Sequence, residues 1–471
     1  MPRRATRRAI EQPRHEGEPG RRGIGIEEGQ ASIVANLTTV DHETAVTEAV
    51  AERRDELVAL ASALIRFDTT AGDPAQPGRQ EAAAQALLAE RLAAAGAETD
   101  VWEPDPAELA AHRRQVPAGI TFAGRPQLLA RFRGNDSARA PSLLLNGHLD
   151  VVSAEPHTAW TDPPFEPVVR DGRLYGRGAC DMKGGVACAV IAAEVLAGLG
   201  VLPLAGDLLV NVVTDEETSG AGSLASALHG ARATAAIVPE PTDFQIWTSA
   251  RGSLLPEITV HGRAGHAEVE QPSWQEGGAV NAIEKARIVA GALQELRERW
   301  RASLRHPRLG RPDLVPTKIH AGEWEITHPG SCVMAYDMPY LPAQADADGW
   351  GTRVERELEE AVRAAAATDG WLAANPPTVR WGIDVPPVDL AADAPVVQLA
   401  RGLAGVVGRD VAAAPKSAWY DGVTFTRLGT PTVAFGPGTI DQAHTVDEYV
   451  PVDDLVACAQ ALAVAALRFA R

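Results

Sequence analysis

The sequence predicts an α/β fold. Apolar runs of strand length alternate with amphipathic helical segments through most of the chain. The run PSLLLNGHLDVV (141–152) is almost continuously apolar, as expected for a strand that a parallel sheet buries on both faces. A second run, DLLVNVVT (207–214), follows a helical segment, and this order is typical of parallel strands joined by helices. We therefore predict a mostly parallel mixed sheet flanked by helices.

The first part of this domain begins near Val46, where apolar residues take up helical spacing. A glycine-rich turn, GRGACDMKGG (176–185), separates its early strands from its next helix. In chain order, the predicted elements are helices over 47–67 and 79–95, strands over 128–132 and 141–152, a helix over 182–199, the strand 207–214, a helix near 223–228 and a strand over 235–239.

The pattern changes near Ala250. The segment 251–269 is typical of a partly exposed strand pair, 277–300 of a long amphipathic helix, and 331–342 of another strand. We interpret residues 250–385 as an inserted α+β domain. Residues 46–249 and 386–471 then form one discontinuous catalytic domain. Its second part contains a helix through Val407, the strand 430–435 and a terminal helix over 453–469.

Composition limits the function classes. The 44 Lys and Arg residues against 62 Asp and Glu residues give a net charge of -18, which disfavours binding to nucleic acid or to anionic lipid. No apolar run approaches membrane-spanning length, and the four cysteines form no CxxC pair. We expect a cytoplasmic, soluble protein. Residues 1–45 lack periodicity and predict a disordered tail.

Acidic and histidine residues cluster at the predicted loops, most of them shortly after a strand. In an open α/β sheet, ligands bind outside the carboxyl ends of the strands, so these loops could converge. Nitrogen and carboxylate donors without thiolates suit Zn²⁺ or a similar divalent ion. The candidates are His148, Asp150, Asp181, Glu216, Glu217, Glu240 and His444.

Three of these candidates have ordinary explanations when taken alone. His148 and Asp150 share one face of an extended segment, so Asp150 could fix the tautomer of His148, yet an HxD motif is usually an ordinary strand end. Asp181 begins a helix, where any carboxylate gains from the helix dipole. The turn before it lacks both the P-loop ending and the GxGxxG spacing, so we discount nucleotide binding.

Glu216 and Glu217 are adjacent, so in an extended stretch their side chains point to opposite sides. One can bind a metal while the other takes a proton from water, which metal-assisted hydrolysis requires. A solvated acidic loop is the ordinary alternative, and Glu240 and His444 are each ambiguous alone. Their joint occurrence at five loops favours a hydrolytic metal site.

Six stretches, in order, resemble one family, the zinc-dependent aminoacylase and deacylase metallopeptidases. This family includes acetylornithine deacetylase, succinyl-diaminopimelate desuccinylase and carboxypeptidase G. The resemblance extends from about Leu57 to the C-terminus. The stretches are LLLNGHLDVV, GRLYGRGACDMKGG, VVTDEETSGAGS, VPEPTD, RGSLLPEITVHGRAGHAE and PTVAFGPGTIDQAHTVDEYV.

The resemblance implies a dinuclear zinc site in which Co²⁺ or Mn²⁺ can substitute. Asp181 would bridge the two ions. Glu216 would be the general acid and base, Asp150 would orient His148, and the peptide bond after Asp181 would be cis. One zinc would take His148, Asp181 and Glu240, and the other would take Asp181, Glu217 and His444.

The insertion resembles the lid and dimerisation domain of the family. His266 would then reach the active site of the partner subunit in a homodimer and stabilise an oxyanion. Asn281 resembles a lid asparagine near the substrate. Asp421, Gly436 and Gly438 would line the substrate pocket. The strand YDMPYLP (336–342) lacks the Arg with which many relatives bind a substrate carboxylate.

The resemblance therefore implies a dinuclear zinc-dependent amidohydrolase. Its substrate would be an N-acyl amide of a small, amino-acid-like molecule, as for a deacetylase, desuccinylase or deformylase. Glu240, where some relatives have Asp, favours this group. A metallo-dipeptidase or carboxypeptidase would use the same centre, and a catalytically silent dimeric binding protein is the alternative outside enzymes.

Overall fold

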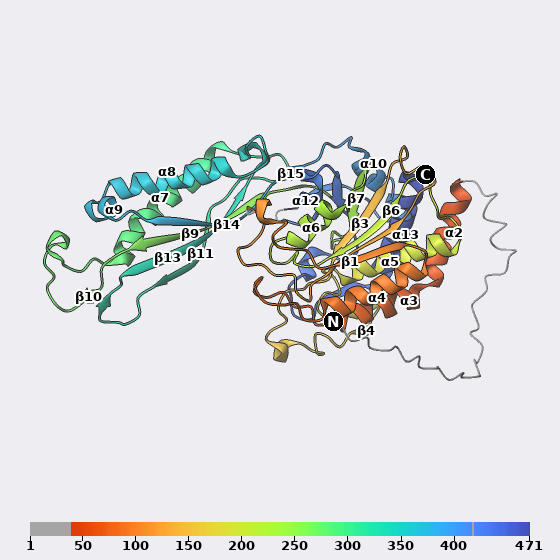
Figure 1. The fold of residues 1–471 in the computed structure, drawn as a ribbon, viewed down its shortest axis with the longest axis horizontal. Helices are drawn as coiled ribbons and strands as arrows, with labels where there is room; N and C mark the ends of the chain where they lie inside the picture. Colours follow the sequence, from red (N-terminus) through yellow and green to blue (C-terminus); the bar gives the residue numbers. More distant parts are fainter. Residues whose placement is uncertain (1–38, 113, 417–418) are drawn as a thin grey trace, which may run out of the picture.

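A computed structural model describes residues 39–112, 114–416 and 419–471 (Figure 1). The first described helix, α2 (Thr39–Glu52), includes residues 39–45, which the sequence placed in the tail. The predicted end of the tail at residue 45 is therefore wrong for residues 39–45. Tertiary packing explains the longer helix, because Val46 and Val50 are fully buried where α2 packs against the C-terminal helix. Residues 1–38 of the predicted tail lie outside the described part.

The central sheet confirms the predicted α/β class. Its described strands run in the order β1-β2-β6-β3-β7-β17-β8-β15, and β16 pairs with β8. Strands β6, β3, β7 and β17 are parallel neighbours, whereas β1, β2 and β15 pair antiparallel at the two edges. The strands are β1 (Glu98–Trp102), β2 (Gln127–Phe132), β3 (Leu143–His148), β6 (Leu208–Val213), β7 (Ala235–Val238), β8 (Ile246–Ala250), β15 (Val388–Asp389), β16 (Ala413–Lys416) and β17 (Thr432–Ala434).

Helices cover both faces of this sheet (Figure 1). Successive side chains of a strand point to opposite faces. In β3, Leu143 and Leu145 accordingly join the larger core, while Leu144 joins the smaller core on the other face. The larger core lies under α2, α3 (Arg54–Ile65), α4 (Glu81–Ala94), α5 (Lys183–Gly198), α10 (Pro395–Arg401), α11 (Ala404–Val407) and α13 (Val452–Phe469), and the smaller lies under α6 (Ala221–His229) and α12 (Gly422–Arg427).

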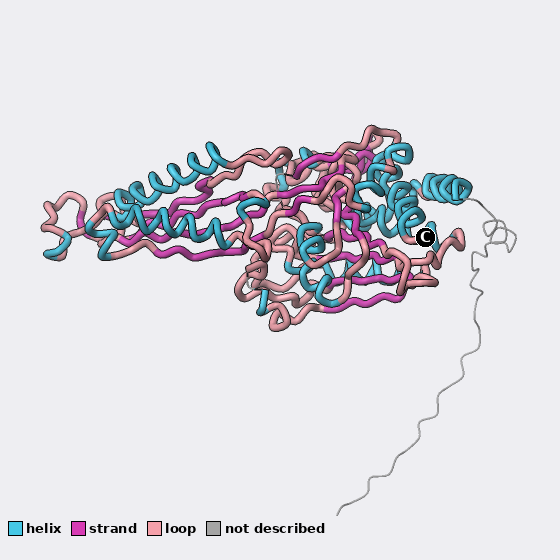
Figure 2. The backbone as a smooth tube through the Cα atoms, turned by 90° about the horizontal axis from the view of Figure 1, so that it is seen from above, coloured by secondary structure: helices cyan, strands magenta, loops and turns pink. Residues whose placement is uncertain are grey.

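Residues 252–385 form a second layered unit, which we call the inserted unit. It projects from the catalytic part as a long sheet with helices along one side (Figure 2). Its main sheet has the order β11-β13-β9-β14, and β10 pairs with β12. Its elements are β9 (Gly252–His261), β10 (Gly265–His266), α7 (Ala282–Ser303), β11 (Val315–Ala321), β12 (Thr327–His328), β13 (Ser331–Tyr340), α8 (Thr352–Ala367), α9 (Gly370–Ala374) and β14 (Thr378–Val385).

The predicted strand pair over 251–269 is wrong in its pairing. Strand β9 lies between β13 and β14 rather than against β10. The reason is local: after β9 the backbone of Arg263 pairs with Val280, which turns the chain out of the sheet before β10 begins. Strand β11 forms the free edge of the sheet, and all seven of its residues are exposed.

A third, small sheet brings two distant loops together. Its strands β18 (Tyr449–Pro451), β5 (Arg173–Tyr175) and β4 (Val168–Arg170) are antiparallel. The pairing of β18 with β5 places the segment after His444 beside the glycine-rich turn 176–185. Within the described ranges, no helix is both long enough and apolar enough to cross a membrane.

The start of α7 yields a stability prediction. Asn281 is the N-cap of this helix, and its side-chain oxygen accepts hydrogen bonds from the backbone N–H of Ile283 (2.9 Å) and of Glu284 (3.4 Å). We expect Asn281→Ala to lower the free energy of unfolding by about 1 kcal/mol, because the two N–H groups lose their acceptor. Asn281→Ser, which keeps an acceptor, should retain most of the stability. Thermal denaturation of both variants tests this, and equal destabilisation would contradict a capping role.

Candidate metal centre

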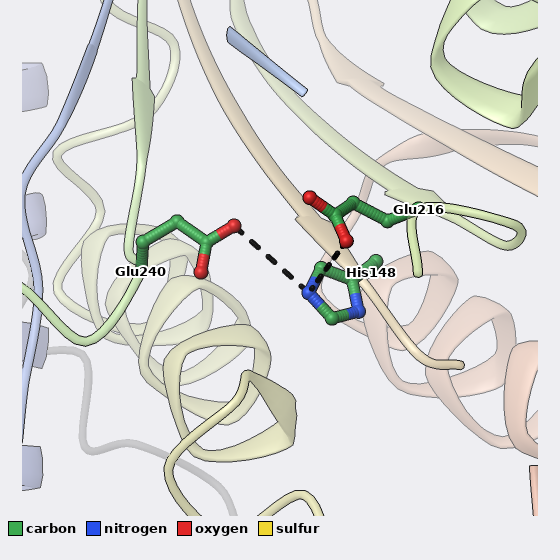
Figure 3. A group of neighbouring side chains, drawn as sticks. All are labelled: His148, Glu216 and Glu240. Atoms are coloured by element: carbon green, nitrogen blue, oxygen red, sulfur yellow. Dashed lines mark ion pairs between the residues drawn. The ribbon is translucent and has the colours of Figure 1, made fainter. Parts of the chain in front are cut away.

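Three parallel strands end at the same place and carry side chains that face one another (Figure 3). His148 is the last residue of β3, Glu216 follows β6, and Glu240 follows β7. The Nε2 atom of His148 lies 3.9 Å from a carboxylate oxygen of Glu216 and 3.9 Å from one of Glu240. The parallel pairing of these strands is therefore what assembles this half of the site.

Asp181 and His444 complete the cluster. The two carboxylate oxygens of Asp181 face different imidazoles: Oδ1 lies 3.3 Å from Nε2 of His148, and Oδ2 lies 3.5 Å from Nε2 of His444. His444 also lies 3.1 Å from Glu217. The structure thus brings together all five predicted ligands and the predicted base, with Asp181 between the two histidines.

The cluster fits divalent metal ions. Possible ligand atoms of His148, Glu216 and Glu240 lie within 4.8 Å of one another, and so do those of His148, Asp181 and Glu217. Nε2 of His148 and Oε1 of Glu217 are buried and make no hydrogen bond. Unpaired buried polar atoms are costly, so both need a partner such as a cation.

The electrostatics of the cluster also favour cations. Burial raises the pKa of Glu216 well above its ordinary value. The charge of His148 lowers this pKa, and the negative charges of Glu240 and Asp421 raise it. Hydrogen bonds to Asp181 and Glu217 raise the pKa of His444 to about 10, against the effect of burial. Carboxylates crowded into a buried site hold protons unless positive charge replaces them.

Asp150 differs from its predicted role. Its carboxylate lies 3.8 Å from Nδ1 of His148, whereas its backbone carbonyl oxygen lies 2.9 Å from that nitrogen. A carbonyl can only accept, so Nδ1 carries the proton and Nε2 keeps its lone pair for a metal. The carboxylate instead accepts the backbone N–H groups of Glu216 (3.2 Å) and Glu217 (2.9 Å). Asp150 therefore fixes the loop that carries the base.

Glu448 supports the bridging residue, and sequence reasoning did not single it out. It is fully buried. Its Oε1 accepts the N–H groups of Cys180 (2.8 Å) and Asp181 (3.0 Å), and its Oε2 accepts the N–H of Gly178 (3.1 Å) and a guanidinium N–H of Arg177 (2.6 Å). One carboxylate thus holds the whole turn before Asp181. Its only sequence signal is its place four residues after His444.

A second missed pair, Arg125 and Asp215, supports the loop of the base from the other side. Both residues are buried, and their charged groups lie 3.1 Å apart. Asp215 has a φ of 73°, and its carboxylate also accepts the hydroxyl groups of Thr218 (2.5 Å) and Ser219. These contacts hold a left-handed turn immediately before Glu216.

A cavity of about 490 Å³ opens beside the cluster. Its described walls combine the charged residues with apolar ones. They are Asp181, Glu216, Glu217, Glu240, Trp247, Pro415, Trp419, Ile440, Ala443 and His444.

The predicted substrate residues do not line this cavity. Asp421 is fully buried at the start of α12, and burial raises its pKa to about 7. Gly436 and Gly438 are buried where the chain packs closely: a Cβ at Gly436 would lie 2.5 Å from the backbone of Pro239, and one at Gly438 2.7 Å from the sulfur of Cys180. These glycines are needed for packing behind the metal ligands.

The two predicted residues of the inserted unit also lie away from the cluster. Asn281 caps α7. His266 is exposed on β10, at the far end of the inserted unit from the catalytic part (Figure 1). Neither side chain contributes to the cavity of its own chain.

Comparison with known proteins identifies the family. Residues 144–468 match peptidase family M20/M25/M40. The chain belongs to this family. An N-formyl-4-amino-5-aminomethyl-2-methylpyrimidine deformylase of Bacillus subtilis is 30% identical to this M20 protein over 86% of the chain and 93% of the relative. An acetylornithine deacetylase of Myxococcus xanthus is 35% identical over 73% of the chain and 83% of the relative.

Solved structures agree on the fold of this M20 protein. The aminopeptidase PepT of Bacillus cereus has a TM-score of 0.65 at 18% identity, over 89% of this chain and 99% of that chain. The family match and the two relatives confirm the resemblance inferred from the sequence motifs. The M20 protein is a hydrolase that acts on carbon–nitrogen bonds. The peptide bond between Asp181 and Met182 is cis, which the resemblance also implies.

The role of Glu448 in this M20 enzyme can be tested through metal affinity. Glu448→Ala removes the acceptor of three backbone N–H groups and leaves Arg177 buried without its partner. We expect the affinity for a divalent ion, measured with Zn²⁺ as the probe, to fall about 10- to 100-fold, because the turn no longer holds Asp181 in place. Competition with a chromophoric chelator measures this.

Two further variants control that experiment. Glu448→Gln keeps one oxygen for the N–H groups of Cys180 and Asp181, and should bind zinc with intermediate affinity. Glu90→Ala, at an exposed position of α4, should bind as the wild type does. Wild-type zinc affinity in a folded Glu448→Ala variant would show that the turn holds its shape without Glu448.

Proposed function

We propose that this M20 enzyme is a dinuclear zinc-dependent amidohydrolase. It cleaves an N-acyl amide of a small, amino-acid-like substrate, as a deacetylase, desuccinylase or deformylase does. The observation that carries the proposal is the position of Asp181 between His148 and His444, with Glu216 close by in the cavity wall. This arrangement offers two neighbouring ligand sets that share one carboxylate, together with a separate base.

In the proposed centre, His148, Asp181 and Glu240 hold one ion, and Asp181, Glu217 and His444 hold the other. The donor atoms are imidazole nitrogens and carboxylate oxygens, which suit Zn²⁺, with Co²⁺ or Mn²⁺ as substitutes. Bound ions would lower the pKa of a water molecule and polarise the amide carbonyl.

Glu216 performs the proton transfers in this proposal. Its carboxylate takes the proton of the attacking water and delivers it to the leaving amine. Asp150 holds the backbone N–H of Glu216, which keeps the base aimed at the cavity. Bound cations would lower the pKa that burial raises in Glu216, so that its carboxylate is free to take the proton of the water.

The cavity favours an N-acyl amide over a peptide with a free carboxylate. Among the described residues of its wall there is no Lys or Arg. A dipeptidase or carboxypeptidase always has to hold a terminal carboxylate, whereas an N-acyl amide such as a formylated amine need not carry one, so the peptidase is the weaker candidate. The Bacillus subtilis relative is named for removing a formyl group from an aminomethylpyrimidine, which supports formyl as one acyl group for this enzyme.

A variant of Glu216 tests the assignment of base and ligands. We expect Glu216→Ala to retain two zinc ions per chain and to lose about 10²- to 10⁴-fold in kcat, because the proton transfers lack their carboxylate. Elemental analysis and amide hydrolysis measure the two quantities. Glu217→Ala is the matched control, since it should lose metal as well as activity.

The alternative assignment has a distinct result. Glu216 also lies within a possible ligand group with His148 and Glu240. Loss of one zinc ion from Glu216→Ala would make Glu216 a ligand and contradict its role as the base. A folded wild type that binds its substrate without zinc would favour a silent binding protein.

We further propose that the inserted unit acts as a lid and joins two copies in a homodimer. His266 lies far from the cluster of its own chain, so its predicted role at the oxyanion requires a partner (Figure 1). The free edge β11 offers a surface for association, with Ile319 at 65% exposure. A cytoplasmic location is supported by the cysteines, all four of which are buried and unpaired.

Mixing two inactive variants tests this dimer. In a mixed dimer of His266→Ala and Glu216→Ala chains, one site has its own Glu216 and receives His266 from the partner. Random exchange should therefore restore about a quarter of the wild-type sites. Activity measured after mixing, against each variant alone, detects the restoration. If His266 acted within its own chain, or if the enzyme were monomeric, mixing would restore nothing.

A further inference from the structure

The cavity beside the metal ligands has an aromatic wall. Apart from the charged cluster, its described lining consists of apolar residues: Trp247, Pro415, Trp419, Ile440 and Ala443. These residues come from β8, β16, the start of the α12 segment and the loop before His444. Two indoles therefore lie at the cavity within the same wall that presents Glu216.

Packing fixes the first indole. Trp247 lies on β8, where it pairs with Ala434 of β17 on one side and with Ala414 of β16 on the other. Only 5% of the residue is exposed. Its ring meets that of Tyr420 edge to face, with 6.2 Å between centroids and an angle of 74°. Such a ring keeps its orientation whether or not a ligand is present.

The second indole is fixed against the loop of the base. A Cβ atom at Gly220 would lie 2.1 Å from Cζ2 of Trp419, so the indole packs directly on this glycine. Gly220 has a φ of 67°, and its N–H donates to the carbonyl oxygen of Asp215 (2.7 Å). The indole of Trp419 is therefore held against the same turn that carries Glu216.

We propose that the amine portion of the substrate carries a planar, uncharged aromatic or heteroaromatic ring, which packs against Trp247 and Trp419. This inference rests on the proposed amide hydrolysis. The formyl, acetyl and succinyl groups considered there contain no ring, so the ring belongs to the amine. A flat ring matches the flat indole surfaces, and none of the described lining residues outside the charged cluster carries a charge that would pair with an ionised ring.

A substrate panel tests the inference on the zinc-loaded wild type. N-formylbenzylamine and N-formyl(cyclohexylmethyl)amine have the same atom connectivity around the amide and similar size, but only the first has a flat ring. We expect kcat/KM to be about tenfold higher for the benzyl compound. Equal rates would overturn the ring assignment and still support amide hydrolysis. Hydrolysis of neither compound, nor of their N-acetyl and N-succinyl analogues, would contradict the proposed function itself.

Variants locate the preference in the wall. Trp419→Leu and Trp247→Leu should each lower kcat/KM more for the benzyl compound than for the cyclohexylmethyl compound, so that the ratio of the two values falls toward one. Trp324→Leu is the control, because this tryptophan is 66% exposed on the inserted unit. Equal losses for both substrates would assign the two indoles a structural role only. Inhibition of the wild type by benzylamine and by cyclohexylmethylamine gives a check that needs no variant: equal inhibition would also contradict the proposal.

Discussion

Mutual repulsion among buried carboxylates is the constraint on which this molecule depends. Asp181, Glu216, Glu217 and Glu240 share a small, largely buried volume with two imidazoles. In a medium of low dielectric constant, such a cluster must take up protons or bind cations. Parallel pairing of β3, β6 and β7 forces the side chains together, because all three strands end at the same edge. The fold therefore crowds negative charge into a buried site, and bound divalent cations would neutralise this charge.

The shape of the site does not rely on the ions alone. Asp150 and Glu448, which lie behind the ligands, accept backbone N–H groups from the two loops that carry the base and the bridging residue. Each of these carboxylates is buried, and each is stabilised by several donors, so neither can move without leaving polar groups unpaired. The Arg125–Asp215 pair adds a third such support. The backbone of the two loops therefore fixes the positions of the ligand side chains before any metal binds. A metal site needs this support, because its ligands must lie at well-defined distances from the ion.

The sequence predicted the fold class, most helices and strands, and the convergence of the ligands, since these depend on local periodicity and on where strands end. It did not predict the supports. Glu448 and Asp215 have no local pattern, and their contacts join segments up to about 270 residues apart. The predictions of where α2 begins and of which strand pairs with β9 were wrong for the same reason, because both features depend on tertiary contacts. Asp150 was placed correctly in the site, but its backbone carbonyl oxygen, rather than its carboxylate, accepts from Nδ1 of His148, and its carboxylate accepts the backbone N–H of Glu217 instead.

The net charge of -18 describes the whole chain and does not describe the local charge at the site once metal ions are bound. Two divalent ions would offset Asp181, Glu216, Glu217 and Glu240, so the loaded centre would be close to neutral. Beyond it the described cavity wall is apolar, so neither a strong attraction nor a strong repulsion of charged substrates arises there. The cavity then selects among amide substrates by their shape and by their contacts with its apolar wall. In the proposed homodimer, a further polar contact would come from the inserted unit of the second copy, because the exposed His266 of the same chain lies on β10, at the far end of its own inserted unit. Substrate recognition would then depend on the assembly of two copies, because the described wall of one chain consists of carboxylates, His444 and apolar residues around the developing oxyanion.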